Sequence, residues 1–194
     1  MKPGNIFFLF ALFPLIPASS TLAYGIVISI AIVWYFLSGI LCKRLVAMID
    51  AGPAGIVAEL VCLGGSASLF LCFLRAFSPL IAVSLSLYAI LSGFTFVLLV
   101  SIDRFPEISG FQIPVLRFIP FYLLFSALRE LLSFGSLSIP VRSGTMTFPI
   151  LPAFDSYRLG FWGTTGGALI LLGLIAWLAK YLNRRVTAYR RNAQ

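Results

Sequence analysis

The sequence predicts an all-α integral membrane protein with six transmembrane helices, arranged as an inverted three-plus-three repeat whose first and fourth helices are broken. Three observations predict it: the composition, six long apolar runs and a repeated proline-containing segment. Of the 194 residues, 60% are hydrophobic and 10% charged, and the mean hydropathy is +1.05. A soluble domain of this size would have a mostly apolar surface. We therefore treat residues 1–194 as a single membrane domain.

The six runs are separated by charged residues or by Gly/Pro clusters, and each approaches the roughly 20 apolar residues that a bilayer requires. They cover residues 5–23, 24–42, 55–75, 77–101, 114–134 and 160–182, with a longer connection at 135–159. Stretches such as "YGIVISIAIVWYFLSGIL" lack the alternating polarity of a membrane β-barrel strand, which favours helices.

The first run could also be a cleavable signal peptide. Lys2 precedes the apolar "IFFLFALFPLI", and small residues "PASSTLA" follow it. However, residues 11–22 and 76–87 are identical at six of twelve aligned positions, Pro14/Pro79 and Ser19/Ser84 among them. A cleaved leader is not expected to repeat an internal span, so we interpret the first run as a helix.

The repeat defines two units, about 1–75 and 76–182, each with three spans. An odd number of spans inverts the second unit in the membrane, and in such folds interrupted helices meet near the bilayer midplane. Proline removes an amide donor, and nearby hydroxyls can supply replacement partners. The candidate midplane residues are Pro14, Pro17, Ser19, Ser20, Thr21, Pro79, Ser84 and Ser86. The alternative is that each proline only kinks a helix whose neighbours satisfy its backbone.

Charge placement predicts the topology. A basic tail, residues 183–194, follows the last span, and a cytoplasmic tail with six spans places the N-terminus in the cytoplasm as well. The inner side then carries ten basic residues: Lys2, Lys43, Arg44, Arg104, Arg117, Lys180, Arg184, Arg185, Arg190 and Arg191. The outer side carries four, Arg75, Arg129, Arg142 and Arg158. This asymmetry favours lipid headgroups over nucleic acid as the partner of the basic residues.

Arg129 and Glu130 lie near the outer end of the fifth run, where charged groups default to a functional interpretation. Adjacent helical residues point about 100° apart, so the two cannot pair face to face. Interfacial anchoring and contact with another subunit both remain open. The three cysteines, Cys42, Cys62 and Cys72, form no metal-binding spacing, and we interpret them as packing residues. No nucleophile–base set or phosphate loop is visible.

Several segments resemble the paired membrane subunits of the Rnf ion-translocating oxidoreductase and the sodium-translocating NADH:quinone reductase. "FPLIPASST" and "PLIAVSL" look like the family's two cysteine-containing motifs, and "LRELLSFGSL" is similar to a segment of the Rnf E subunit and of its counterpart, the reductase D subunit. "GGALILLGLIAWLAKYLNRR" is similar to the last span of that protein, which ends in the cytoplasm. The resemblance covers most of the chain and implies six spans and an inverted repeat.

In that family, two cysteines from this subunit and two from an inverted partner hold an iron-sulfur cluster that relays electrons across the membrane. Here Phe13 and Leu85 occupy the cysteine positions, and neither side chain can ligate iron. The resemblance therefore implies a scaffold without its own cluster ligands, catalytic residues or bound cofactor. It also implies a homologous partner of the Rnf A or reductase E type, and the inner membrane of a prokaryote.

The leading hypothesis is a cluster-less subunit of an electron transport, ion-translocating oxidoreductase complex. A different class, a small transporter, would use the hydroxyls of the two broken helices to line a midplane site. A third possibility is a purely structural membrane subunit. The sequence identifies neither a transported ion or solute nor a redox donor.

Overall fold

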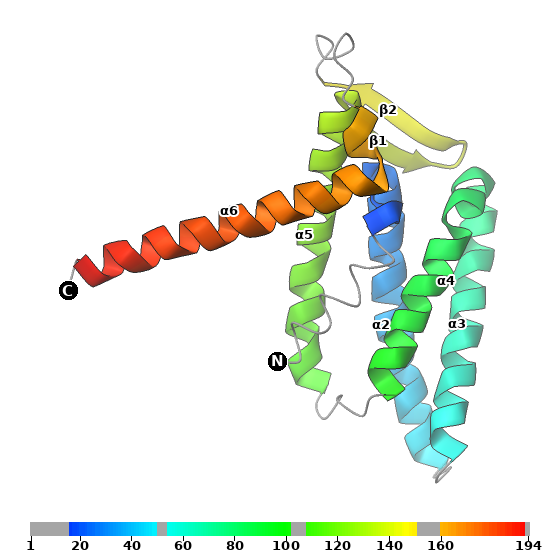
Figure 1. Ribbon diagram of the computed structural model, residues 1–194. Coiled ribbons are helices and arrows are strands. Elements are labelled where there is room, and N and C mark those ends of the chain that lie inside the picture. Colours follow the sequence, from blue (N-terminus) through cyan, green and yellow to red (C-terminus); the bar gives the residue numbers. More distant parts are fainter. Residues whose placement is uncertain (1–15, 50–53, 102–107, 151–159, 193–194) are drawn as a thin grey trace.

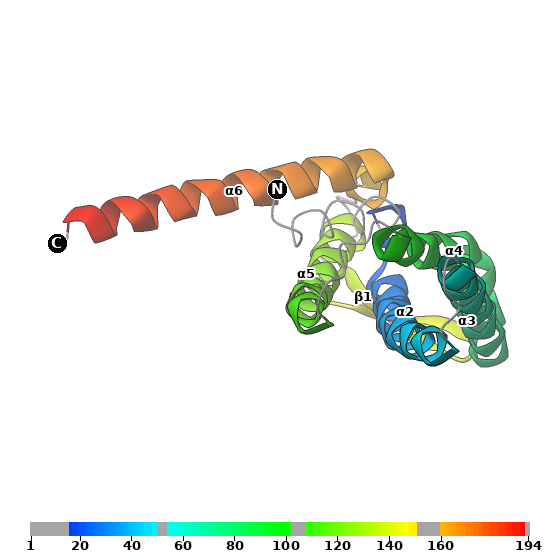
Figure 2. The same cartoon turned by 90° about the horizontal axis from the view of Figure 1, so that it is seen from below.

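The computed structural model describes residues 16–49, 54–101, 108–150 and 160–192. Four long helices form an antiparallel bundle: α2 (Leu22–Ile49), α3 (Gly55–Phe77), α4 (Pro79–Ser101) and α5 (Ile108–Phe134). In Figures 1 and 2, α2 lies between α5 and the side-by-side pair of α3 and α4. A helical turn at residues 16–18 precedes α2. The first expected span, 5–23, lies mostly outside the described residues.

Two apolar clusters hold the helices together. The larger lies where α2, α3, α4 and α5 meet, and includes Ile28, Ile32, Phe70, Ile81 and Phe118. The smaller joins Ile16, Phe125, Ala168 and Leu171, so it ties the start of the last helix to α5 and to the turn before α2.

Within the described part of the chain, three helices are long and apolar enough to cross a membrane, over Leu22–Val46, Val57–Phe77 and Thr165–Leu182. They correspond to the second, third and sixth expected spans, and they indicate a multi-pass membrane protein. The fourth and fifth expected spans are present as helices α4 and α5. α4 runs from Pro79 to Ser101 and includes the apolar helical stretch Pro79–Gly93.

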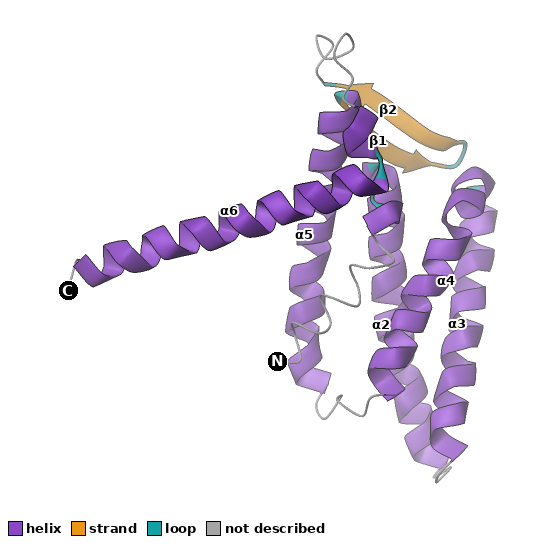
Figure 3. Cartoon of the chain, in the orientation of Figure 1, coloured by secondary structure: helices purple, strands orange, loops and turns teal. Residues whose placement is uncertain are grey.

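The expectation of an all-α chain is wrong at the connection after α5. Strands β1 (Ser136–Val141) and β2 (Gly144–Pro149) form an antiparallel hairpin across one end of the bundle (Figure 3). Gly135, with φ of 64°, ends α5 in the left-handed conformation that glycine adopts without a Cβ penalty. This turn directs β1 onto the ends of α2 and α5, while β2 contacts α4.

The expectation of a break within the fourth helix is also wrong. α4 is continuous from Pro79, its first residue, and Ser78 alone separates it from α3. Proline suits the first position of a helix because that position has no intrahelical acceptor for an N–H group. The repeated proline therefore begins a helix in the second copy, and its counterpart in the first copy, Pro14, lies outside the described residues.

The last helix, α6 (Thr165–Asn192), follows the short 3-10 helix η3 (Gly160–Gly163). Figures 1 and 2 show α6 running crosswise away from the bundle. Its first turns pack on α5 through Ala168 and Leu171, whereas Trp177 and Leu178 are exposed. The helical backbone continues through most of the predicted basic tail, to Asn192.

Candidate functional site

The helical conformation is interrupted between the turn at residues 16–18 and the start of α2 at Leu22. We call this interruption the break. Within the interruption, the Ile16 carbonyl accepts hydrogen bonds from the Ser19 amide (3.3 Å) and the Ser19 hydroxyl (2.8 Å). The Thr21 hydroxyl accepts a bond from the Tyr24 amide (3.4 Å) in the first turn of α2. This interruption follows Pro17 and uses hydroxyls in its hydrogen bonds, whereas most of the first expected span, in which a break was predicted, lies outside the described residues.

Arg129 on α5 lies against this break and is 1% exposed. It donates five hydrogen bonds: Nη1 to the Ile16 carbonyl (2.7 Å) and Ser19 Oγ (2.8 Å), Nε to the Trp162 carbonyl (2.9 Å), and Nη2 to the carbonyls of Gly163 (2.8 Å) and Thr164 (3.0 Å). A guanidinium has five N–H donors, so every one is used. Arg129 therefore joins the break before α2 to the turn before α6.

Glu130, the next residue of α5, is also 1% exposed and acts at the other side of the break. Its Oε2 accepts hydrogen bonds from the Leu22 amide (2.6 Å) and the Ser138 hydroxyl (2.9 Å). The Ser138 oxygen in turn accepts a bond from the Ala23 amide (3.2 Å). A carboxylate from a distant helix and a serine of the hairpin thus cap the first two amides of α2.

The signs of the two charges match the helix ends that they contact. Carbonyls at a helix C-terminus carry partial negative charge, and amides at an N-terminus partial positive charge. Arg129 binds the carbonyl end of the turn at 16–18, and Glu130 binds the amide end of α2. We call these two residues, with their hydrogen bonds, the Arg129–Glu130 clamp. The clamp supplies hydrogen-bond partners for backbone groups that the break would otherwise leave unpaired inside the membrane domain.

Small residues allow the clamped segments to approach α5 closely. A Cβ added at Gly25 would lie 2.6 Å from Ser126 Oγ, and one at Gly163 would lie 2.7 Å from Ser133 Oγ. Ser126 and Ser133 lie on the same face of α5 as the clamp, because they are three or four residues from Arg129 and Glu130. The face of α5 toward α2 and η3 is therefore a buried polar stripe.

The structure does not bring the other predicted site residues to the break. Ser84 and Ser86 lie on the outer side of α4, where their hydroxyls bond to the carbonyls of Leu80 and Val83 (both 3.2 Å) in their own helix. Ser20 lies in the same turn as Ser19. Phe13 and Pro14 lie outside the described residues. A single site lined by hydroxyls from both proline segments, as the transporter alternative requires, is not assembled in the described part of this chain.

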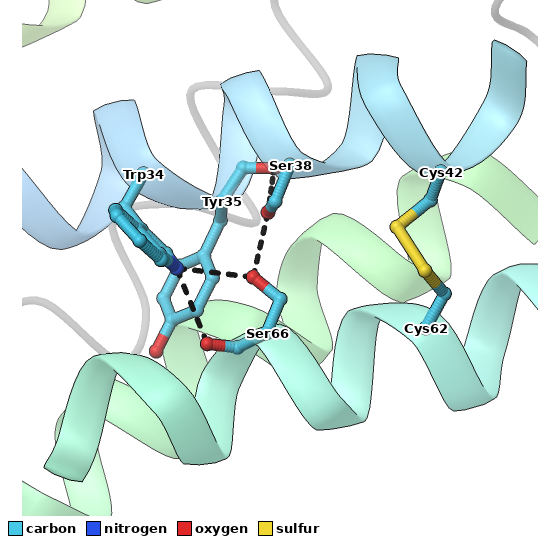
Figure 4. The surroundings of a disulfide bond; sticks show 6 residues. All are labelled: Trp34, Tyr35, Ser38, Cys42, Cys62 and Ser66. Carbon is cyan, nitrogen blue, oxygen red and sulfur yellow. Dashed lines mark hydrogen bonds between the residues drawn. A yellow bond between two sulfur atoms is a disulfide. The ribbon is translucent and has the colours of Figure 1, made fainter. Parts of the chain in front are cut away.

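Two sequence interpretations need correction here. Arg129 and Glu130 are buried within this chain, so they are neither interfacial anchors nor an exposed contact for another subunit. Cys42 and Cys62 are joined in a disulfide between α2 and α3, with their Cα atoms 6.1 Å apart (Figure 4), whereas Cys72 is a free, exposed thiol. Among the described residues, no three histidine, cysteine or carboxylate side chains gather into a metal site.

Comparisons of this chain with protein-family models, with curated proteins and with solved structures found no match.

Proposed function

We propose that this chain is a membrane subunit of an Rnf/Nqr-type electron transport, ion-translocating oxidoreductase complex, divergent in lacking its own cluster ligands. The observation that carries the proposal is the Arg129–Glu130 clamp. The segment "LRELLSFGSL", one of those that carry the resemblance, supplies the clamp and the glycine that ends α5, and the serine that caps α2, Ser138, follows it directly. This segment therefore holds the turn at residues 16–18 and the start of α2 against α5.

The proposal includes six spans in an inverted three-plus-three repeat, with both termini in the cytoplasm of a prokaryote. The charge asymmetry supports this orientation, because Lys43 and Arg44 lie at one end of the bundle and Arg142 lies in the hairpin at the other. In the complex, α6 crosses the bilayer with its later turns covered by lipid or by a homologous, inverted partner. Its exposed apolar side chains beyond the first turns support such a contact.

The family's iron-sulfur cluster does not fit the residues present. Leu85, at the position of the second cysteine, is 1% exposed and packs in the main apolar cluster with Ile81 and Ala82. Its hydrocarbon side chain offers no ligand to iron. We therefore assign this chain a scaffolding task beside a partner and derive no electron-transfer step through it.

A mild-detergent pull-down from the native membrane tests the proposal. We expect the tagged chain to retain a homologous membrane subunit and a flavoprotein subunit. The matched controls are Arg129→Gln, which removes the clamp, and Arg142→Gln, which removes an exposed arginine of the hairpin. Loss of the partners in the first variant alone supports the proposal. A chain that purifies alone and takes up solute in proteoliposomes would overturn it, as would iron and acid-labile sulfide in the isolated chain.

A further inference from the structure

The contact between α2 and α3 is built in layers spaced four residues apart on both helices. In one layer, the rings of Trp34 and Phe70 pack with their centroids 6.4 Å apart. In the next, the Ser66 hydroxyl donates a hydrogen bond to Ser38 Oγ (2.7 Å). The Trp34 indole N–H donates to the Ser66 hydroxyl (3.1 Å) and carbonyl (3.2 Å), which joins the two layers. Figure 4 shows the hydrogen bonds among Trp34, Ser38 and Ser66 between the helices.

Cys42 and Cys62 form the next layer, four residues beyond Ser38 on α2 and four before Ser66 on α3. The ring and hydroxyl layers set the register of the two helices independently of the sulfur–sulfur bond. Reduction of the bond therefore leaves the two thiols facing each other, with Cα atoms at a separation that permits the bond to form again. This geometry allows the disulfide bond to break and to form again.

Both sulfurs lie inside candidate membrane spans. Cys42 is four residues from the end of Leu22–Val46, and Cys62 is five residues from the start of Val57–Phe77, which places each about 6 to 8 Å inside. Cys42 is buried and Cys62 is partly exposed. Exchange with a water-soluble thiol requires a charged thiolate at the disulfide, and moving that charge into hydrocarbon is costly. An uncharged, lipid-soluble reactant reaches the sulfurs without carrying a charge into the hydrocarbon.

We propose that Cys42 and Cys62 form a redox-active pair that is oxidised by a lipid-soluble quinone reaching the partly exposed Cys62. In this reaction the two S–H bonds break and one S–S bond forms. The two electrons and two protons pass to the two carbonyl oxygens of the quinone, which becomes a quinol. The pair does not depend on the complex proposed above, because it lies on α2 and α3 and away from the clamp.

The test uses the Cys72→Ser chain in nanodiscs of neutral lipid, so that Cys42 and Cys62 are the only cysteines whose thiols are counted. The protein is reduced with tributylphosphine, an uncharged and lipid-soluble reductant, desalted without oxygen, and then mixed with decylubiquinone or with the same concentration of glutathione disulfide. Free thiols are counted by the gel shift that a maleimide polymer gives after denaturation. We expect the quinone to restore the disulfide roughly tenfold faster than glutathione disulfide does, with one quinol formed per chain.

Three results would overturn the inference: a pair that tributylphosphine cannot reduce in the folded protein, thiols that the quinone leaves unreacted, or equal rates with the two oxidants. Cys42→Ser is the control for quinol formation, because a single thiol cannot complete the reaction. Ser38→Ala tests the register argument, since it removes a hydroxyl layer but keeps both sulfurs. We expect slower reoxidation in that variant, with a circular dichroism spectrum like that of the parent chain.

Discussion

Replacing Arg129 with methionine removes the five donors of the clamp and keeps an apolar side chain of similar length. The Ile16 carbonyl retains two donors from Ser19, and the Thr164 carbonyl retains an amide of α6. The carbonyls of Trp162 and Gly163 lose their Arg129 donors. An unsatisfied buried acceptor costs about 1 to 3 kcal/mol, so two cost about 2 to 6 kcal/mol. Because both residues are only partly buried, we expect a loss of about 3 kcal/mol.

The free energy of unfolding can be measured by titrating the protein in mild-detergent micelles with a denaturing detergent, with helix content followed by circular dichroism. Arg129→Lys should fall between the parent and Arg129→Met, because an ammonium group has three donors for five acceptors. Arg142→Met, at an exposed position of the hairpin turn, should change the value by less than about 0.5 kcal/mol. If Arg129→Met proves as stable as Arg142→Met, the clamp does not hold the break.

Two further substitutions test the packing around the break. Glu130→Gln keeps an acceptor for the Leu22 amide but loses the negative charge at the N-terminus of α2. We expect the free energy of unfolding to fall by about 1 kcal/mol. Hydrogen exchange should become faster at the amides of Leu22 and Ala23, and unchanged exchange in α4 is the control. Gly25→Ala places a Cβ 2.6 Å from Ser126 Oγ and should cost about 1 to 3 kcal/mol. Adding Ser126→Gly should restore most of that loss of unfolding free energy, whereas an equal loss in the double variant would show that the contact is not the cause.

The interruption at residues 19–21 has local signals in the sequence, namely Pro17 and the hydroxyls after it. The absence of a matching break in the fourth expected span was not predictable. Proline inside a helix and proline at the first position of a helix look alike in an alignment. What distinguishes them is the turn at Ser78, where the backbone is extended, with φ of −147° and ψ of 96°. Six identities in twelve residues therefore identified a related segment but not a related conformation.

The disulfide had a signal that the sequence interpretation did not use. Cys42 and Cys62 are each ten residues from position 52, near the middle of the connection between α2 and α3. An antiparallel helix pair with a short connection places such residues opposite each other. Interpreting the three cysteines as packing residues missed this pairing, because the contact is between two helices.

The hydrogen-bond partners of Arg129 and Glu130 could not be predicted from the sequence. The clamp joins segments more than a hundred residues apart, such as Leu22 with Glu130. The prediction that the two adjacent charges cannot pair face to face points to the reason why both are present. A single buried charge would be left uncompensated in a membrane domain, whereas a neighbouring pair is neutral overall. Because the pair points in two directions, it can stabilise opposite ends of one break.

Three of the five bonds from Arg129 go to residues 162–164, immediately before α6, and two go to the break before α2. The same guanidinium therefore sets where the first described turn ends and where the last helix begins. Since the clamp already occupies the polar groups of the break that it contacts, the break is better suited to redirecting the chain than to binding a solute. This arrangement supports the scaffolding task that we propose for the chain.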